Sequence, residues 1–353
     1  MSHVRTVASF LVAMSVVTPA ASVAQANDPT TMRSVGNFSG NRKQVEGVER
    51  PFFEGLTRTT GLPLTVTFSP MDALGVQGAD ALRHLRSGAF DVMSVQINLA
   101  SRDEPFFEGV DLIGVSTNVE DLRKVVAAYR GAFDKRLQER FGSKMLTLWP
   151  FGPQVFFCNV PIRTLDDLKG LKVRTSSASM AQLVQKLGAT AVTLPFSEVY
   201  PALQRGVANC AITSPTAGNS AKWPEITSHF LPLSLSAGVQ GHFVSLAYWN
   251  RFSPEAQQKL AAAFKRMEDE MWDLAIKANE DASNCNIGKE PCVEGTKFAM
   301  TLVTVSPEDT AKIRDAVSTV ILPAWRDICN RVDPNCTKIW NETIGSVTGY
   351  AIK

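Results

Sequence analysis

A strand, loop and helix unit occurs repeatedly between residues 161 and 218, and this repetition constrains the fold more than any other feature of the chain. Residues 171–174 alternate in polarity as a strand does, and a helix with apolar residues at three- and four-residue steps follows them. Residues 191–194 and 207–213 predict two further strands, with another helix between them. Strands that alternate with helices predict a parallel sheet with helices packed on its faces.

Each of these three predicted strands ends in side chains that suit ligand binding. Arg174 lies at the carboxyl end of the first strand, Phe196 follows the second, and Thr213 and Ser214 close the third. In open α/β sheets the carboxyl ends of the strands face the crevice where ligands bind, so we expect these side chains to converge. Arg174 is the lone charged side chain among them.

The amino-terminal half repeats the same pattern. Residues 32–39, 64–69 and 90–97 predict strands, with helices between them. Their ends carry a second set of polar candidates: Asn37, Ser69, Gln96 and Asn98. Two α/β halves with facing strand ends predict a two-domain clamshell, with a cleft between the halves.

The 353 residues, 44% of them hydrophobic, are enough for two domains. We expect lobe I at residues 27–150, with a return segment at about 241–252, and lobe II at 151–240. Residues 145–149 and 243–249 are expected to be strands that cross between the lobes, so that the sheets are mixed. Residues 253–353 are expected to form a long linking helix and further helical segments that pack across both lobes.

Residues 1–26 have the pattern of a signal peptide. Arg5 precedes an apolar stretch, and Ala24, Gln25 and Ala26 form a small-residue cleavage site. Arg5 is the only charged residue of this segment, so cleavage near Ala26 lowers the net charge from +2 to about +1. A near-neutral chain has no basic surface that would recruit nucleic acid or a membrane. The expected location is the bacterial periplasm.

The six cysteines fit an oxidising compartment. Cys285 and Cys292 enclose one short loop, and Cys329 and Cys336 enclose another of equal length, so each pair is expected to form a local disulfide. Zinc binding is the alternative, but zinc sites favour closer cysteine pairs or nearby histidines. Cys158 and Cys210 lie on predicted strands of the same half; they either pair across the sheet or stay as buried thiols.

Three stretches resemble the periplasmic solute receptors of tripartite ATP-independent periplasmic (TRAP) transporters, of the dicarboxylate-receptor type. They are TLDDLKGLKVRT, GATAVTLPFSEVYPALQRGV and, more loosely, ADALRHLRSGAFDV. The resemblance implies two α/β domains joined by crossing strands and a long helix. It also implies that these domains close over a small organic acid, which is then passed to a membrane permease. In that family the arginine of the KxR strand binds the ligand carboxylate, and Arg174 matches it.

The resemblance also places Phe196 in the pocket, while Gln154 departs from the pattern because many acid-binding relatives have a second arginine near this position. An amide suits a hydroxyl, keto or amide group, so a monocarboxylate or a zwitterion is as plausible a ligand as a dicarboxylate. For Arg174 the alternative is a structural ion pair with Asp166 or Asp167.

The rival interpretations are a secreted enzyme and the binding component of another uptake or chemosensory system. The chain lacks the GxSxG, HExxH, Walker and GxGxxG motifs that would favour catalysis or a nucleotide cofactor. No cofactor is expected, whether a metal ion helps to neutralise the ligand is left open, and a monomer is the expected state.

Overall fold

The computed structural model describes residues 30–353, so the predicted signal peptide lies outside the described residues. The described chain is a mixed α/β structure with two six-stranded sheets, as predicted. The first sheet contains β1 Thr31–Gly36, β2 Thr65–Pro70, β3 Val92–Gln96, β4 Ser143–Met145, β5 Trp149–Pro150 and β11 Val239–Ser245. The second contains β6 Val155–Cys158, β7 Lys172–Thr175, β8 Thr190–Thr193, β9 Cys210–Thr213, β10 His229–Leu231 and β12 Thr301–Leu302.

The two sheets share one topology. In the first sheet β2, β1 and β3 are parallel neighbours in that order, and β11 joins β3 antiparallel. In the second sheet β8, β7 and β9 are parallel neighbours, and β6 joins β9 antiparallel. Among the three parallel strands of each sheet, the one that comes first in the chain (β1 or β7) therefore lies between the other two. The next one in the chain (β2 or β8) lies at the edge of the sheet. The two halves of the sequence, which repeat one pattern of strands and helices, therefore also repeat one order of strands.

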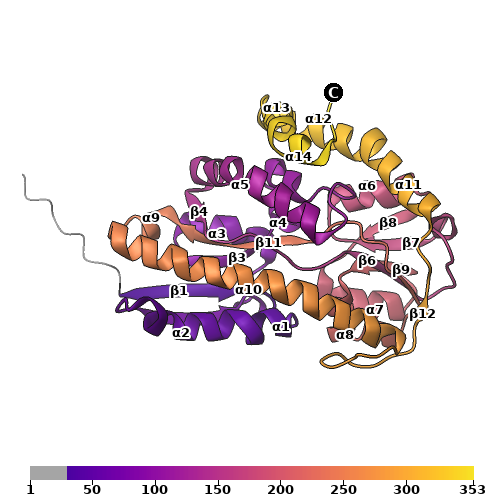
Figure 1. The fold of residues 1–353 in the computed structure, drawn as a ribbon, viewed down its shortest axis with the longest axis horizontal. Helices are drawn as coiled ribbons and strands as arrows, with labels where there is room; N and C mark the ends of the chain where they lie inside the picture. The colour runs from indigo at the N-terminus through magenta and orange to yellow at the C-terminus, as the bar shows by residue number, and fades with distance from the viewer. Residues whose placement is uncertain (1–29) are drawn as a thin grey trace, which may run out of the picture.

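Helices and short 3₁₀ or π turns (η) connect the strands and cover the sheets (Figure 1). Those of the first half are α1 Arg42–Gln44, η1 Val45–Glu49, α2 Arg50–Thr60, η2 Asp72–Leu74, η3 Gly78–Asp80, α3 Ala81–Ser87, α4 Ile97–Ala100, η4 Pro105–Asp111 and α5 Val119–Phe141. Those of the second half are η5 Leu165–Leu168, α6 Ala178–Lys186, η6 Phe196–Glu198, α7 Val199–Gln204, α8 Pro215–Ser220 and η7 Trp223–Glu225.

The remaining helices are α9 Leu246–Trp249, α10 Pro254–Ile287, α11 Pro307–Ala316, η8 Val317–Ile321, α12 Leu322–Val332, α13 Cys336–Trp340, η9 Asn341–Gly345 and α14 Ser346–Thr348. In Figure 1, α10 runs along one side of both sheets, while the carboxyl-terminal helices lie on the other side.

Two extended segments carry the chain between the sheets. Residues 151–154 lead from β5 to β6, and residues 232–238 lead from β10 to β11. They pair with each other: Gly152 N donates to Ala237 O over 2.9 Å, and Gln154 N donates to Ser236 O over 2.8 Å. Gly152 has a φ of +141°, and a Cβ at this position would lie 2.1 Å from Asn279 Nδ2 on α10. The crossing is therefore narrow and requires glycine at residue 152.

Three sequence predictions about these elements need correction. The expected crossing strand at 145–149 is two short strands, β4 and β5, both paired with β11 in the first sheet. The expected return strand at 243–249 begins earlier, at Val239, and residues 246–249 form helix α9 instead. The carboxyl-terminal segment is not wholly helical, because β12 joins the second sheet beside β10. The numerical limits of the two lobes stay a prediction.

Helix α10 joins the two halves. Ser253 Oγ accepts from Ala256 N at its start, Pro254 occupies its first turn, and Gly288 ends it with a φ of +74°. Its buried face packs on α2 in the first half and on α8 in the second. Asn279 ties the crossing segment to the second half, because its Nδ2 donates to Phe151 O and its Oδ1 accepts from Thr216 N. Every helix within residues 30–353 is too short or too polar to cross a membrane, and this includes the 34-residue α10.

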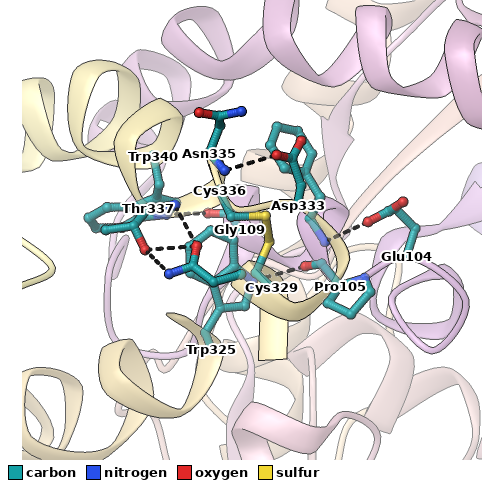
Figure 2. Close-up of a disulfide and its surroundings, with 12 residues drawn as sticks. Glu104, Pro105, Gly109, Trp325, Cys329, Asp333, Asn335, Cys336, Thr337 and Trp340 are labelled. Atoms are coloured by element: carbon teal, nitrogen blue, oxygen red, sulfur yellow. Dashed lines mark hydrogen bonds between the residues drawn. A yellow bond between two sulfur atoms is a disulfide. The ribbon is translucent and has the colours of Figure 1, made fainter. Parts of the chain in front are cut away.

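The carboxyl-terminal helices are fixed to η4 of the first half. Figure 2 shows the disulfide between Cys329 and Cys336, which joins α12 to α13. The indoles of two buried tryptophans on these helices reach main-chain carbonyls of η4: Trp325 Nε1 donates to Pro105 O over 2.9 Å, and Trp340 Nε1 donates to Gly109 O over 3.1 Å. This end of the chain therefore holds η4 in place.

All six cysteines are paired. The two local disulfides predicted from loop spacing, Cys285–Cys292 and Cys329–Cys336, are present. The question left open for the other two is answered by a third disulfide, Cys158–Cys210, which joins directly opposed residues of the antiparallel strands β6 and β9. It spans 52 residues of sequence, compared with 7 for each local disulfide.

We predict that the long-range disulfide contributes more stability than a local one. The chain-entropy estimate is about 4 kcal/mol for a closed loop of this length and about 2.5 kcal/mol for a short one. Urea unfolding of the double variant Cys158→Ala/Cys210→Ala should thus show a larger loss of unfolding free energy than Cys285→Ala/Cys292→Ala, which serves as the control. Equal losses, or the reverse order, would contradict the prediction.

Candidate functional site

The candidate site is a cavity of about 80 Å³ between the two sheets. Its wall is built from strand ends of both halves and from the segments that cross between them. The lining residues are Phe38, Asn41, Gln96, Asn98, Phe151, Gln154, Arg174, Ser176, Phe196, Thr213, Ala217, Gly238 and Gln240. The convergence of strand ends expected from the sequence therefore occurs at one place.

The structure brings some of the predicted residues to this cavity and leaves others away from it. Those that line it are Gln96, Asn98, Gln154, Arg174, Phe196 and Thr213. Three predicted residues do not line it: Asn37, Ser69 and Ser214. Ser69 is the penultimate residue of β2, the edge strand of its sheet. Ser214 Oγ is used at the start of α8, where it accepts from Ala217 N.

Among residues 30–353, Arg174 is the only charged residue in the wall of this cavity. It is 4% exposed, and burial lowers its pKa to about 10, so it stays protonated at neutral pH. Its Nε and Nη2 donate to Leu194 O over 3.0 and 2.8 Å, and its Nη1 donates to Ile212 O over 3.1 Å. These carbonyls belong to the ends of the strands on either side of β7. The strand order of the sheet therefore fixes the guanidinium.

The alternative of a structural ion pair for Arg174 is wrong. Asp166 instead pairs with Lys312 Nζ over 2.6 Å, and Asp167 accepts from the main-chain N–H groups of Arg163 and Thr164. Within residues 30–353, the hydrogen bonds of Arg174 go only to main-chain carbonyls. A guanidinium has five N–H donors, so two remain, one on each Nη atom. One N–H on each Nη atom is the donor pair with which a guanidinium can bind both oxygens of a carboxylate.

Asn37 supports the cavity wall from behind. Its side-chain oxygen accepts from Asn41 Nδ2 over 2.6 Å and from Gln96 Nε2 over 3.3 Å, and its Nδ2 donates to Gln240 Oε1. Its main-chain N–H donates to Glu49 Oε2 over 2.9 Å, deep in the protein. Asn37 thus orients three amides that do line the cavity.

The two halves meet across the cavity. Asn98, just after β3, donates from Nδ2 to Ser176 Oγ, just after β7, over 3.3 Å. Phe196 packs its ring against Trp223, with centroids 5.5 Å apart, so the apolar side of the wall is held by a buried tryptophan. The site thus combines one cation, several amides and an aromatic face.

A smaller cavity of about 20 Å³ adjoins the first and shares Asn98, Gln154, Ser176 and Gly238 with it. It is also lined by two acidic residues of η4, Glu108 and Asp111. Burial raises the pKa of Glu108, although Ser179 Oγ donates to its carboxylate over 2.6 Å.

Asp111 is half-buried at the edge of this cavity, and burial of its carboxyl raises its pKa to about 6. Its carboxylate accepts from Val239 N over 2.8 Å and from Ala237 N over 3.1 Å, at the crossing segment.

Sequence reasoning missed several residues of the site. Asn41 and Gln240 line the cavity, and Glu108 and Asp111 line its neighbour. Gln240 is in β11, whose start was placed too late, and the acidic pair lies in a short turn with no strand-end pattern. The only local signal was at the start of this turn, where Glu104 caps it and a proline follows. Within the described part of the chain, no group of three or more His, Cys, Asp or Glu side chains is arranged to hold a metal ion.

Comparison with known proteins agrees with this architecture. The sequence model of the bacterial extracellular solute-binding proteins, family 7, matches residues 37–327. Over 229 residues the chain is 28% identical to the C4-dicarboxylate-binding periplasmic protein DctP of Rhodobacter capsulatus. That alignment covers 64% of this chain and 65% of the relative, slightly less than two thirds of its length.

Two solved structures share the fold. One is a TRAP periplasmic solute-binding protein of Desulfovibrio salexigens with bound orotic acid, with a TM-score of 0.77 and 17% identity over 90% of this chain and 100% of that one. The other is an extracytoplasmic solute receptor of Bordetella pertussis that binds pyroglutamic acid, with a TM-score of 0.76 and 17% identity over 89% of this chain and 100% of that one.

We predict a characteristic pH dependence from Asp111. Because its folded-state pKa is about 6 and its usual value is 3.8, the folded state binds more protons than the unfolded state between these pH values. Wild-type stability therefore falls through this group as the pH rises from about 4 to 6. Relative to wild type, Asp111→Asn should gain about 1 to 3 kcal/mol of unfolding free energy over that interval.

Urea unfolding at several pH values measures this difference. Asp121→Asn is the control, because hydrogen bonds from Asn118 and Lys124 lower the pKa of that exposed carboxyl and its replacement should give no such gain. A difference between Asp111→Asn and wild type that does not change with pH would refute the prediction.

Proposed function

The chain belongs to family 7 of the bacterial extracellular solute-binding proteins, and on this premise we propose that it is the periplasmic solute receptor of a TRAP transporter. In this role it captures a small organic acid between its two lobes and delivers it to the integral-membrane permease subunits. It acts as a binding protein without catalysis. The sequence of residues 1–26, with its expected cleavage near Ala26, supports export to the periplasm.

The observation that carries this proposal is the buried cation of Arg174. Taking a guanidinium out of water is unfavourable unless an anion and hydrogen bonds compensate for the lost hydration. Two main-chain carbonyls supply part of that compensation, and no carboxylate within the described residues supplies the rest. A ligand carboxylate bound to the two remaining N–H groups completes it.

Closure follows from the position of the cavity. Its wall comes from both halves, so a ligand held by Arg174 contacts residues of the first half, such as Gln96 and Asn98, only when the lobes are together. Contacts made only in the closed form shift the population toward that form. The closed form then differs from the open one in the surface it presents to the permease.

The relatives and neighbours support a carboxylate ligand. C4-dicarboxylates, orotic acid and pyroglutamic acid, which the compared proteins bind, are all small organic acids. For this chain we propose the shared chemistry, a carboxylate on Arg174, as the common element. A monomer is the proposed working state, with transient docking to the permease.

We predict that Arg174→Ala abolishes measurable binding of the acid that binds wild type, and that Arg174→Lys weakens it by about 10- to 100-fold. Lysine keeps the positive charge but lacks the paired N–H donors of the guanidinium, and one charge-assisted hydrogen bond contributes about 1.5 to 3 kcal/mol. Titration calorimetry after a thermal-shift screen of organic acids measures both. Lys172→Ala, an exposed residue two positions away on the same strand, is the control and should bind as wild type does.

If both Arg174 variants bound the same acid with unchanged affinity, the role assigned to Arg174 would be wrong. Mass spectrometry of the recovered acid tests the absence of catalysis: stoichiometric binding with unaltered acid is expected, whereas turnover would favour the secreted enzyme.

A further inference from the structure

The charge in the wall of the larger cavity is positive and comes from one side chain. Arg174 is its single cation, and the rest of its polar wall consists of amides and hydroxyls. The amides are Asn41, Gln96, Asn98, Gln154 and Gln240. A ligand carboxylate on Arg174 therefore has a charged partner, but a second carboxylate on the same ligand would meet only neutral groups.

Gln154 lies where the two cavities join, because it lines both of them. Its Nε2 donates to Gly152 O over 2.9 Å, which orients the amide along the crossing segment. Its Oε1 has no hydrogen-bond partner among the described residues, so this acceptor is available to a ligand. The amide therefore offers this acceptor and one further N–H but no charge, so it matches a ligand N–H or O–H donor and gives a carboxylate no charged partner.

Glu108 and Asp111 strengthen this preference from beyond Gln154. Both line the smaller cavity, and η4, which carries them, is held by the indoles of Trp325 and Trp340 (Figure 2). Their raised pKa values show that negative charge is already unfavourable here. When ionised, these carboxyls repel an additional carboxylate, and when protonated they offer it a hydrogen bond but no positive charge.

We propose that this cavity selects acids with one carboxylate, held by Arg174, and an N–H donor at the opposite end, held by Gln154 and facing Glu108 and Asp111. The ligand class is thus the half-amides, lactam acids and amino acids, and dicarboxylates are disfavoured. This inference rests on the proposed function, since it needs Arg174 as the carboxylate anchor.

Matched acids of nearly equal shape test the inference. Calorimetry compares succinate with succinamate and glutarate with glutaramate, with 4-aminobutyrate as a cationic N–H donor. We expect at least one half-amide or the amine to bind about tenfold or more tightly than its dicarboxylate. If the dicarboxylates bound as tightly as their half-amides or more tightly, the inference would be overturned while the receptor function stayed intact. The same conclusion would follow if other organic acids bound and no acid of this set did.

Two substitutions identify the groups responsible. Gln154→Arg adds a second cation and should invert the preference, so that the dicarboxylate binds more tightly than its half-amide. Glu108→Gln keeps an acceptor for Ser179 and removes the carboxyl, so it should narrow the difference by improving dicarboxylate binding. A preference unchanged in both variants would overturn the assignment to this end of the cavity. If no organic acid of any class bound, the proposed function itself would fail.

Discussion

The buried guanidinium of Arg174 is the constraint on which the site depends. Burial in a low-dielectric interior makes an unpaired charge unfavourable, and it lowers the pKa of this arginine to about 10. The flanking strands β8 and β9 partly compensate through the carbonyls of Leu194 and Ile212. Because those carbonyls and β7 belong to one sheet, the cation is fixed by backbone geometry, with two N–H groups left toward the cavity.

The remainder of the structure keeps the opposing wall in position. The crossing segments pair with each other, Asn279 of α10 binds one crossing segment and α8, and the carboxyl-terminal helices hold η4 through two indoles. These contacts come from four distant parts of the chain. They hold the amides of the cavity that contains Arg174 and the two acidic groups of its neighbour, and this asymmetry of charge is the basis of the proposed preference for one class of acid.

Much of the fold could be predicted because it depends on local signals. Periodicity and glycine stops located β7, β8 and β9 within a few residues, and strand-end position identified Arg174. The failures have physical reasons. Ser69 was expected at the site because strand ends look alike in sequence, but β2 continues to Pro70 and Ser69 does not line the cavity. Ser214 was expected to face the cleft, but a hydroxyl before a helix also caps it, and this hydroxyl does.

The sequence by itself determined the alternation of strands and helices, the repeated unit, the two local disulfides and the identity of the one strong cation at a strand end. These follow from period, spacing and charge within short windows. Only the tertiary structure decided which strand ends are central, that Cys158 pairs with Cys210, and that Gln240, Glu108 and Asp111 share the site. Those contacts join residues far apart in the chain, and they depend on sheet order and on the crossing between lobes, which no local pattern specifies.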